Sequence, residues 1–314
     1  MTALWRLQPV GIVGLGLIGG SLGLDLQARG ACVRALVHRP ETAMRARERG
    51  LATTVSTDPS VLADCGLVVL ALPLDRLLAP DPALLAALPP DAVLTDVGSV
   101  KGPVQEAWHA LGPRFVPSHP MAGTAQAGVE AGQADLFAGR PWVATPAPDT
   151  DPQALQAVRQ LAEALGARWC CCSASDHDRA VALISHLPVL VSAGLLLACE
   201  SASVEAPVLA PLLRRLASSG FADTSRVGGG NPELGMLMAR ANRQALLSAL
   251  GHYRQALEEL ERLVGDERWP ELQRLLSLCQ TLRPGYLQPT ALRGAAAQSP
   301  DPPAAAGTAS TPTG

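Results

Sequence analysis

Aromatic residues and lysine are scarce in this sequence. Phenylalanine, tryptophan and tyrosine make up 3% of the 314 residues, and Lys101 is the only lysine, whereas 48% of the residues are hydrophobic. We therefore expect an aliphatic core packed mainly from Leu, Val and Ala. The length exceeds that of one ordinary domain and predicts two domains in a soluble globular protein.

Charged residues are also limited, at 17% of the chain with a formal net charge of -3 at pH 7. This balance offers no general attraction for nucleic acid or an anionic membrane, so any anion site must be local. We expect a small-molecule ligand, with neither nucleic acid nor a membrane as partner.

The most apolar stretch, residues 181–199, is interrupted by polar residues and Pro188, and we interpret it as a buried helix. The first apolar strand begins near Val10, which leaves no room for a signal peptide and favours a cytoplasmic location.

The seven cysteines include no Cys-x-x-Cys pair. Cys170, Cys171 and Cys172 are consecutive, and neighbouring residues of a strand point to opposite faces. This spacing suits neither a zinc site nor a disulfide framework. We interpret the cysteines as reduced thiols and expect no metal.

Short apolar runs alternate with helical patterns through the first half of the chain. This alternation is typical of βαβ units and predicts a mostly parallel sheet in an α/β domain over residues 1–174. A helix is expected at about 152–165. The predicted strands are residues 10–14, 33–37, 67–72, 93–97, 114–118, 142–145 and 168–172.

From residue 175 the chain reads as an all-α domain that extends to residue 287. One predicted helix begins after Asn231, which can cap it with Pro232 at the first helical position. Its length suggests packing against a second subunit, so we expect a homodimer. Residues 288–314 have little apolar bulk and are predicted to form a disordered tail. The predicted helices are residues 176–202, 205–218, 232–264 and 267–281.

Three glycines, Gly14, Gly16 and Gly19, directly follow the first predicted strand and open a helix. In a Rossmann-type fold the first permits a tight turn, the second lets the backbone approach a pyrophosphate, and the third lets the helix pack on the strand. The helix N-terminus at Leu17 and Ile18 then binds the anionic pyrophosphate. The strand before the glycines and the repeated βα units favour a dinucleotide site over an ordinary glycine turn. We therefore predict a nicotinamide-dependent oxidoreductase.

The end of the second predicted strand distinguishes the two nicotinamide dinucleotides. NAD enzymes place an acidic residue there for the ribose 2′-hydroxyl, whereas this chain has His38 and Arg39. A guanidinium and an imidazole can hydrogen-bond a 2′-phosphate, so the pair favours NADP over NAD. The alternative is a solvated loop in which Glu41 or another group serves NAD.

Two loops after predicted strands carry candidate catalytic residues. The segment DVGSVKG at 96–102 places Ser99 near the nicotinamide, where it either binds a hydroxyl or caps the following helix. The segment SHPMAG at 118–123 contains His119, which can take a proton near neutral pH as carbinol oxidation requires. We favour His119 as the base over a structural histidine. Three other histidines lie in helical or charged contexts typical of surface residues, namely His109, His177 and His252.

The helical half adds two candidate ligand-binding residues. His186 lies in the segment SHLP, and Arg226 lies beside a glycine cluster. Arg226 can clamp a carboxylate in bidentate fashion, and Asp223 could orient it. A buried, satisfied histidine and a surface ion pair are the alternatives.

The segments GLGLIGGS, DVGSVKG, SHPMAGT, SHLP and DTSRVGGGNPE occur in an order and spacing that resemble the prephenate and arogenate dehydrogenases of tyrosine biosynthesis. The resemblance covers residues 10 to about 285 and is greatest with the compact NADP-dependent arogenate dehydrogenases of cyanobacterial type. It implies oxidative decarboxylation of L-arogenate to L-tyrosine with NADP. Conversion of prephenate to 4-hydroxyphenylpyruvate with NAD(P) is the alternative.

The resemblance also implies roles for individual residues. His119 would deprotonate the 4-hydroxyl of the substrate, Ser99 would orient that group, and Arg226 would bind the ring carboxylate. His186 and Thr124 would line the substrate pocket. Some family members have a second histidine and a glutamate where this chain has Val189 and Ala125, and these two differences bear on substrate choice and gating.

Two more remote hypotheses are a β-hydroxyacid dehydrogenase and an NADP-sensing protein. The first uses a lysine of its helical domain as acid and base, but residues 175–285 contain none. The second would keep the glycine loop without needing His119 and Arg226 together.

Overall fold

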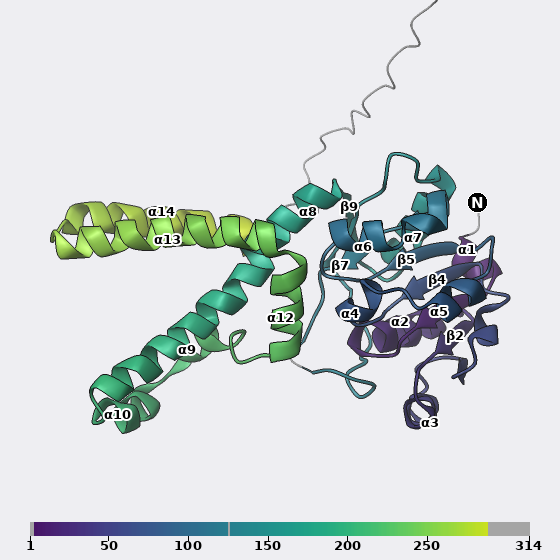
Figure 1. The fold of residues 1–314 in the computed structure, drawn as a ribbon, viewed down its shortest axis with the longest axis horizontal. Coiled ribbons are helices and arrows are strands. Elements are labelled where there is room, and N and C mark those ends of the chain that lie inside the picture. Colours follow the sequence, from purple (N-terminus) through teal and green to yellow (C-terminus); the bar gives the residue numbers. More distant parts are fainter. Residues whose placement is uncertain (1–2, 125, 288–314) are drawn as a thin grey trace, which may run out of the picture. The chain divides into compact units, whose positions relative to one another are not determined.

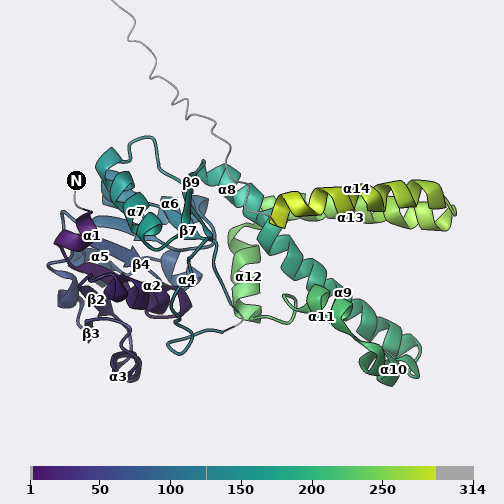
Figure 2. The ribbon, with the colours of Figure 1, turned by 180° about the vertical axis from the view of Figure 1, so that it is seen from behind.

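The computed structural model describes residues 3–124 and 126–287 (Figures 1 and 2). The chain divides into two compact units, residues 1–252 and the part from Tyr253 on. The tail at 288–314, predicted to be disordered, and Ala125 lie outside the described residues. The predicted boundary between domains near residue 174 marks a change in sequence character and stays a prediction.

A six-stranded parallel sheet forms the centre of the first unit, in the order β3-β2-β1-β4-β5-β6. This is the doubly wound order of nucleotide-binding folds, and it confirms the predicted Rossmann-type sheet. β3 was not predicted, because it has only three residues, and Val55 is the only apolar one among them. The strands are β1 Val10–Val13, β2 Val33–Leu36, β3 Thr54–Ser56, β4 Leu67–Leu70, β5 Val93–Asp96 and β6 Phe115–Val116.

Helices cover both faces of this sheet, so its central strands β1 and β4 are buried along their whole length. Successive residues of β1 face opposite sides, with Ile12 in one hydrophobic cluster and Val13 in the other. The first cluster includes side chains of α2, α3 and α7, and the second includes side chains of α4, α5 and α6. The helical elements of this region are α1 Leu4–Leu7, α2 Leu17–Ala28, α3 Pro40–Glu48, η1 Pro59–Leu62, α4 Leu74–Leu77, α5 Pro82–Ala87, α6 Gly102–Ala107, η2 His109–Arg114 and α7 Pro152–Ala164.

A second, three-stranded sheet corrects the expectation of one continuous strand series. It consists of β7 Ser118–Pro120, β8 Pro141–Ala144 and β9 Arg168–Cys171. β7 pairs antiparallel with β8, and β8 pairs parallel with β9. The predicted strand 114–118 breaks at Pro117, which has no N–H for a strand ladder. The next N–H, that of Ser118, donates to the Asp96 carboxylate at 3.1 Å and leaves the parallel ladder.

The helical half contains more and shorter helices than the sequence predicts. The predicted helix 232–264 is wrong, because it is divided at Asn242, whose backbone is non-helical (φ −113°, ψ 32°). Asn231 does cap α12, since its side-chain oxygen accepts hydrogen bonds from the N–H groups of Glu233 and Leu234. α12 packs against α4 and places Leu237 in the second hydrophobic cluster of the sheet. These helices are α8 Ala174–Val181, α9 Leu187–Glu205, α10 Leu209–Leu216, α11 Ser219–Ser225, α12 Pro232–Ala241, α13 Arg243–Gly265 and α14 Trp269–Leu287.

A π-helical turn, Ala182–His186, joins α8 to α9, and Pro188 follows in the first turn of α9. The whole stretch Ala174–Glu205 is long and apolar enough to cross a membrane, judged by length and composition alone. Only 28% of its most apolar window is buried within the chain. The expectation of a buried helix is therefore wrong for the single chain, because apolar side chains such as Leu197 and Val204 are exposed.

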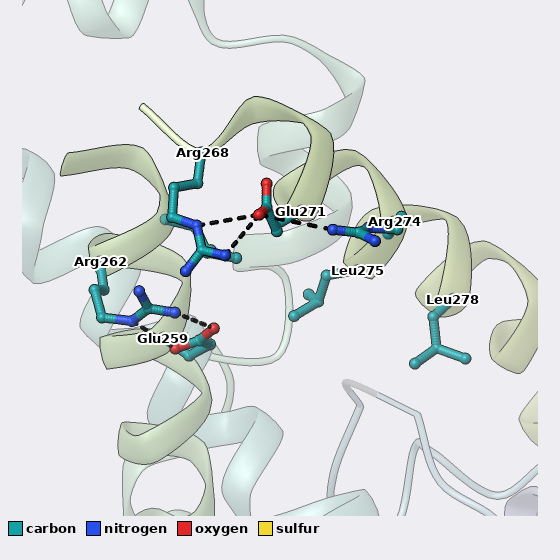
Figure 3. A pocket seen from close by; sticks show the side chains of 8 residues that line it. Glu259, Arg262, Arg268, Glu271, Arg274, Leu275 and Leu278 are labelled. Carbon is teal, nitrogen blue, oxygen red and sulfur yellow. Dashed lines mark hydrogen bonds and ion pairs between the residues drawn. The ribbon is translucent and has the colours of Figure 1, made fainter. Parts of the chain in front are cut away.

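In the second unit, the end of α13 and α14 form a hairpin whose charged side chains pair with each other (Figure 3). Arg262 contacts Glu259 at 2.7 Å, and Arg268 contacts Glu271 at 2.6 Å. A cleft of about 320 Å³ lies between these residues. Exposed ion pairs of this kind contribute little to stability.

Candidate active site

The glycine turn between β1 and α2 has the shape that a dinucleotide requires. Gly14 has φ +95°, and a Cβ there would lie 2.5 Å from the carbonyl oxygen of Ala71. A Cβ at Gly19 would lie 1.9 Å from the carbonyl oxygen of Gly14, so the helix can approach the turn only with glycine there. By contrast, a Cβ at Gly16 would meet nothing within 4 Å. The N–H groups of the first turn of α2, beginning at Leu17 and Ile18, thus border an open space that fits phosphate groups.

His38 and Arg39 lie exposed between β2 and α3, and Arg39 is the residue that precedes the first turn of α3. Neither forms an ion pair with any residue that the structure describes. Glu41, the alternative partner for a ribose, is also exposed in the first turn of α3. The strand end therefore presents an imidazole, a guanidinium and one carboxylate to a ligand.

His119 is half-buried in β7 and belongs to a chain of hydrogen-bonded side chains. Its Nδ1 lies 3.0 Å from Nε2 of His177, and Nδ1 of His177 lies 2.8 Å from the Asp178 carboxylate. Asp178 also accepts the backbone N–H groups of Lys101 and Gly102, at 2.7 and 2.8 Å. The chain thus joins β7, α8 and the loop that leads into α6.

The expectation that His177 is a surface residue is wrong, because only 2% of it is exposed. Its neighbours Asp176 and Asp178 are charged, which is the pattern that suggested a solvated position. Asp178 instead turns inward to receive the N–H groups at the start of α6. His177 and Asp178 are the functional candidates that sequence reasoning missed.

A buried ion pair lies below the same loop. The Lys101 side chain is fully buried, and its ammonium group donates hydrogen bonds to the Asp96 carboxylate and, at 2.7 Å, to the carbonyl oxygen of Ser118. Asp96 also accepts the N–H groups of Gly98 and Ser118. Each charge is therefore hydrogen-bonded, which is the condition under which buried ions are tolerated.

The surroundings of His119 favour its neutral form. Burial lowers the pKa of His119 well below its ordinary value of 6.5, and the positive charge of Lys101 lowers it further. Protonated His177 or His186 would act in the same direction. His119 is therefore an unprotonated imidazole at neutral pH, as a general base must be.

His186 lies buried at the end of the π-helical turn, and its proton can be placed on one nitrogen. The side-chain NH₂ of Asn242 donates to the carbonyl oxygen of Asp178 at 2.7 Å and to Nδ1 of His186 at 3.2 Å. The proton of His186 is thus on Nε2, which has no hydrogen-bond partner among the described residues. Burial lowers the pKa of His186 to about 4, although the Asp178 carboxylate raises it. His186 is a neutral donor available to a ligand.

Three other predicted residues are not hydrogen-bonded to this network in the described part of the chain. Ser99 is half-buried, whereas Thr124 is exposed and accepts the N–H of Gln126 at 3.2 Å. Arg226 is exposed at the end of α11, and the expected ion pair with Asp223 is not formed between these described residues. The structure thus brings His119 and His186 together through Asp178 and Asn242, and leaves Ser99, Thr124 and Arg226 free of that network.

Three features together define a nucleotide-dependent dehydrogenase: a doubly wound parallel sheet, a glycine turn that fits a dinucleotide, and the neutral, half-buried His119. More narrowly, the chain belongs to the prephenate dehydrogenase family. Models of the nucleotide-binding domain and the dimerization domain of prephenate dehydrogenase match residues 22–171 and 173–278. The resemblance found in the five sequence segments is therefore confirmed, and the β-hydroxyacid dehydrogenase hypothesis is set aside.

Individual relatives agree with this assignment. The cyclohexadienyl dehydrogenase of Zymomonas mobilis is 32% identical over 265 residues, which cover 83% of this chain and 89% of that protein. The crystal structure of Synechocystis arogenate dehydrogenase is 43% identical, with a TM-score of 0.76 over 89% of this chain and 100% of that one. Prephenate dehydrogenase from A. aeolicus, in complex with hydroxyphenyl propionate and NAD⁺, is 28% identical with a TM-score of 0.82 over 89% and 98% of the two chains.

Proposed function

We propose that the protein is an NADP-dependent arogenate dehydrogenase that forms L-tyrosine by oxidative decarboxylation. The observation that carries the proposal is a neutral, half-buried His119 in the same fold as the glycine turn at Gly14 to Gly19. The choice of arogenate draws support from the 43% identity to Synechocystis arogenate dehydrogenase. Prephenate is the second candidate substrate, because the Zymomonas and A. aeolicus relatives are named for cyclohexadienyl and prephenate dehydrogenation.

The cofactor would be held by the glycine turn and by the side chains of His38 and Arg39 at the end of β2. The pyrophosphate would bind the N–H groups of Leu17 and Ile18, where the backbone at Gly16 leaves space. His38 and Arg39 would donate hydrogen bonds to a 2′-phosphate. Without these two side chains, the Glu41 carboxylate would repel that phosphate. The A. aeolicus structure contains NAD⁺, so the choice of NADP depends on His38 and Arg39.

When bound, the nicotinamide supplies the hydride acceptor for the ring carbon that bears the 4-hydroxyl. Nε2 of His119 accepts the hydroxyl proton as the carbon–hydrogen bond breaks. Loss of a hydride and of CO₂ from a substrate with one ring carboxylate leaves a neutral phenol. The electron pair of the broken carbon–carbon bond moves through the ring to the oxygen, which takes its proton back. His119 therefore holds the proton only transiently.

Three other side chains would hold the substrate. Nε2–H of His186 is a buried donor without a partner in the described chain, and it suits an oxygen of the substrate. Arg226 would bind the ring carboxylate through its guanidinium, and Ser99 would orient the 4-hydroxyl. Thr124 would line the pocket.

A homodimer formed through the helical half explains why α9, α10 and the turn between them expose apolar side chains. Leu197, Val204, Val208 and Leu216 are 68%, 81%, 76% and 68% exposed in the single chain. The family model matched to residues 173–278 is a dimerization domain. A second copy would cover this surface in a cytoplasmic enzyme, and sedimentation velocity would then show a dimer at micromolar concentration. A monomer there would contradict the homodimer.

The proposed function is tested by comparing arogenate and prephenate with NADP and NAD in all four combinations. We expect the highest kcat/KM for arogenate with NADP. An equal or higher value for prephenate with NAD would overturn both specificities and leave the reaction class standing. Arg39→Glu should raise the KM for NADP about tenfold or more, because it replaces an attractive charge by a repulsive one. Arg76→Glu, at an exposed side chain of α4, is the matched control and should leave the KM for NADP unchanged.

A further inference from the structure

We propose that His177 and Asp178 are positioning residues, which fix the proton of His119 on Nδ1 and balance the charge that His119 acquires. The inference rests on the proposed function, because it concerns the residues behind the base of that reaction. It starts from the three consecutive hydrogen bonds that connect His119 to the start of α6.

The direction of these hydrogen bonds is set at Asp178. Burial raises the pKa of Asp178, but hydrogen bonds from His177, Gly102 and Lys101 outweigh burial, and the net shift is downward. Asp178 is therefore a carboxylate, which can only accept hydrogen bonds. Its contact with Nδ1 of His177, at 2.8 Å, requires the proton to be on that nitrogen.

The remaining protons follow from this one. In its neutral form His177 carries this one proton, and its Nε2 is then an acceptor. The 3.0 Å contact to Nδ1 of His119 is then donated by His119, whose Nε2 is left with a free electron pair. A carboxylate two side chains away thus selects the tautomer in which His119 can act as a base. A carboxylate orients a histidine in the same manner in serine proteases.

The same chain stabilises the protonated state of His119. Lys101, His177 and His186 are the titratable groups that face His119, and each of them, when positive, opposes its protonation. Asp178 is the negative group joined to His119 through hydrogen bonds, by way of His177. His177 and Asp178 are only 2% and 8% exposed, so a proton held on His119 is not passed to solvent through them. This closed arrangement suits a reaction that returns the proton to the oxygen from which it came.

The test combines kinetics with NMR spectroscopy of the histidine nitrogens. His177→Leu should lower kcat about 100-fold, because it removes the acceptor that fixes the His119 tautomer and breaks the connection to the Asp178 carboxylate. KM and the affinity for NADP should change less than about threefold. His177→Gln, whose amide oxygen can still accept from Nδ1 of His119, should recover about tenfold over His177→Leu. His109→Gln, at an exposed histidine of η2, is the matched control and should leave kcat unchanged.

The ¹⁵N spectrum gives a readout that a purely structural role would not affect. In the wild-type protein His119, assigned by comparison with His119→Ala, should show a protonated Nδ1 and an unprotonated Nε2. In His177→Leu the two nitrogens should approach averaged shifts. A wild-type His119 that carries its proton on Nε2, or a folded His177→Leu with unchanged kcat, would overturn the inference.

The two proposals can fail separately. The NMR measurement on the free protein needs no substrate, so it decides the tautomer even if His177→Leu does not fold. If the wild-type protein reduces neither NADP nor NAD with arogenate or prephenate, the proposed function fails whatever the tautomer. If it turns over and His177→Leu turns over equally fast, the function stands and the positioning role is wrong.

Discussion

The sheet half and the helical half of this protein differ in how completely their apolar side chains are buried and their buried polar groups are paired within the single chain. In the sheet half, two aliphatic clusters are closed by helices, and the buried ions Lys101 and Asp96 are paired with each other. In the helical half, α9 exposes Leu197 and Val204, and His186 keeps a buried N–H without a partner in the described chain. The sheet half therefore closes its own core, whereas the helical half leaves groups that the proposed substrate and second subunit would cover.

Removing the proposed base, His119, should have the largest effect. His119→Ala should lower kcat about 1,000-fold, because general base catalysis contributes roughly 10² to 10⁴ in rate. The affinity for NADP should be preserved, since the glycine turn does not depend on this side chain. Isothermal titration with NADP and steady-state kinetics would measure the two effects. A kcat within threefold of the wild-type value would exclude His119 as the base.

The internal pairing of the sheet half is tested at its only lysine. Lys101→Met leaves the Asp96 carboxylate buried without its cation, and we expect a loss of roughly 3 to 5 kcal/mol in the free energy of unfolding. Chemical denaturation would measure it. Arg159→Met, which breaks an exposed pair with Glu163, should cost less than about 1 kcal/mol. Equal losses in both variants would show that the buried pair does not support the sheet half.

Sequence patterns predicted the sheet half better than the helical half for a physical reason. β1 and β4 are apolar throughout, and the glycines after β1 are required by contacts within a few residues and with one neighbouring strand. The break at Asn242 depends instead on hydrogen bonds to Asp178 and His186, which are distant in sequence. Helix propensity depends on neighbouring residues and not on such distant contacts, so the sequence pattern predicted a single helix over 232–264.

The candidate site shows the same limit. His119 could be found because it follows a strand in a recognisable segment, but His177 could not, because its acidic neighbours resemble a solvated helix. Only the fold shows that Asp178 turns toward the N–H groups of Lys101 and Gly102. The separate sheet formed by β7, β8 and β9 was missed for a similar reason, since it depends on Asp96 accepting the N–H of Ser118.

The buried N–H of His186 predicts a pH dependence of stability in the helical half. The folded pKa is about 4, below the ordinary value of 6.5, so between these values the unfolded chain binds a proton that the folded chain does not. The stability associated with this group is complete above pH 6.5 and is lost as the pH falls toward 4, by up to about 3 kcal/mol. His119 contributes a loss of the same sign.

Denaturation of the wild-type protein and of His186→Gln at several pH values would isolate this contribution. The difference between the two proteins should change by about 3 kcal/mol between pH 7 and pH 4. His252→Gln, at an exposed histidine of α13, should follow the wild-type curve. Parallel curves for the wild type and His186→Gln would mean that His186 is not held neutral.

The smallest expected effect is that of Arg226→Ala, which tests whether the helical half binds the substrate without taking part in the chemistry. Arg226→Ala should raise the KM for arogenate by about 10- to 100-fold, because a charge-assisted hydrogen bond contributes roughly 1.5 to 3 kcal/mol. The kcat should change less than about threefold, since the proton and hydride steps would use other groups. Arg76→Ala, at an exposed arginine of the sheet half, should leave both constants unchanged. A lower kcat at constant KM in Arg226→Ala would mean that the guanidinium acts on the transition state. The helical half would then take part in the chemistry, and the division between the two halves would be wrong.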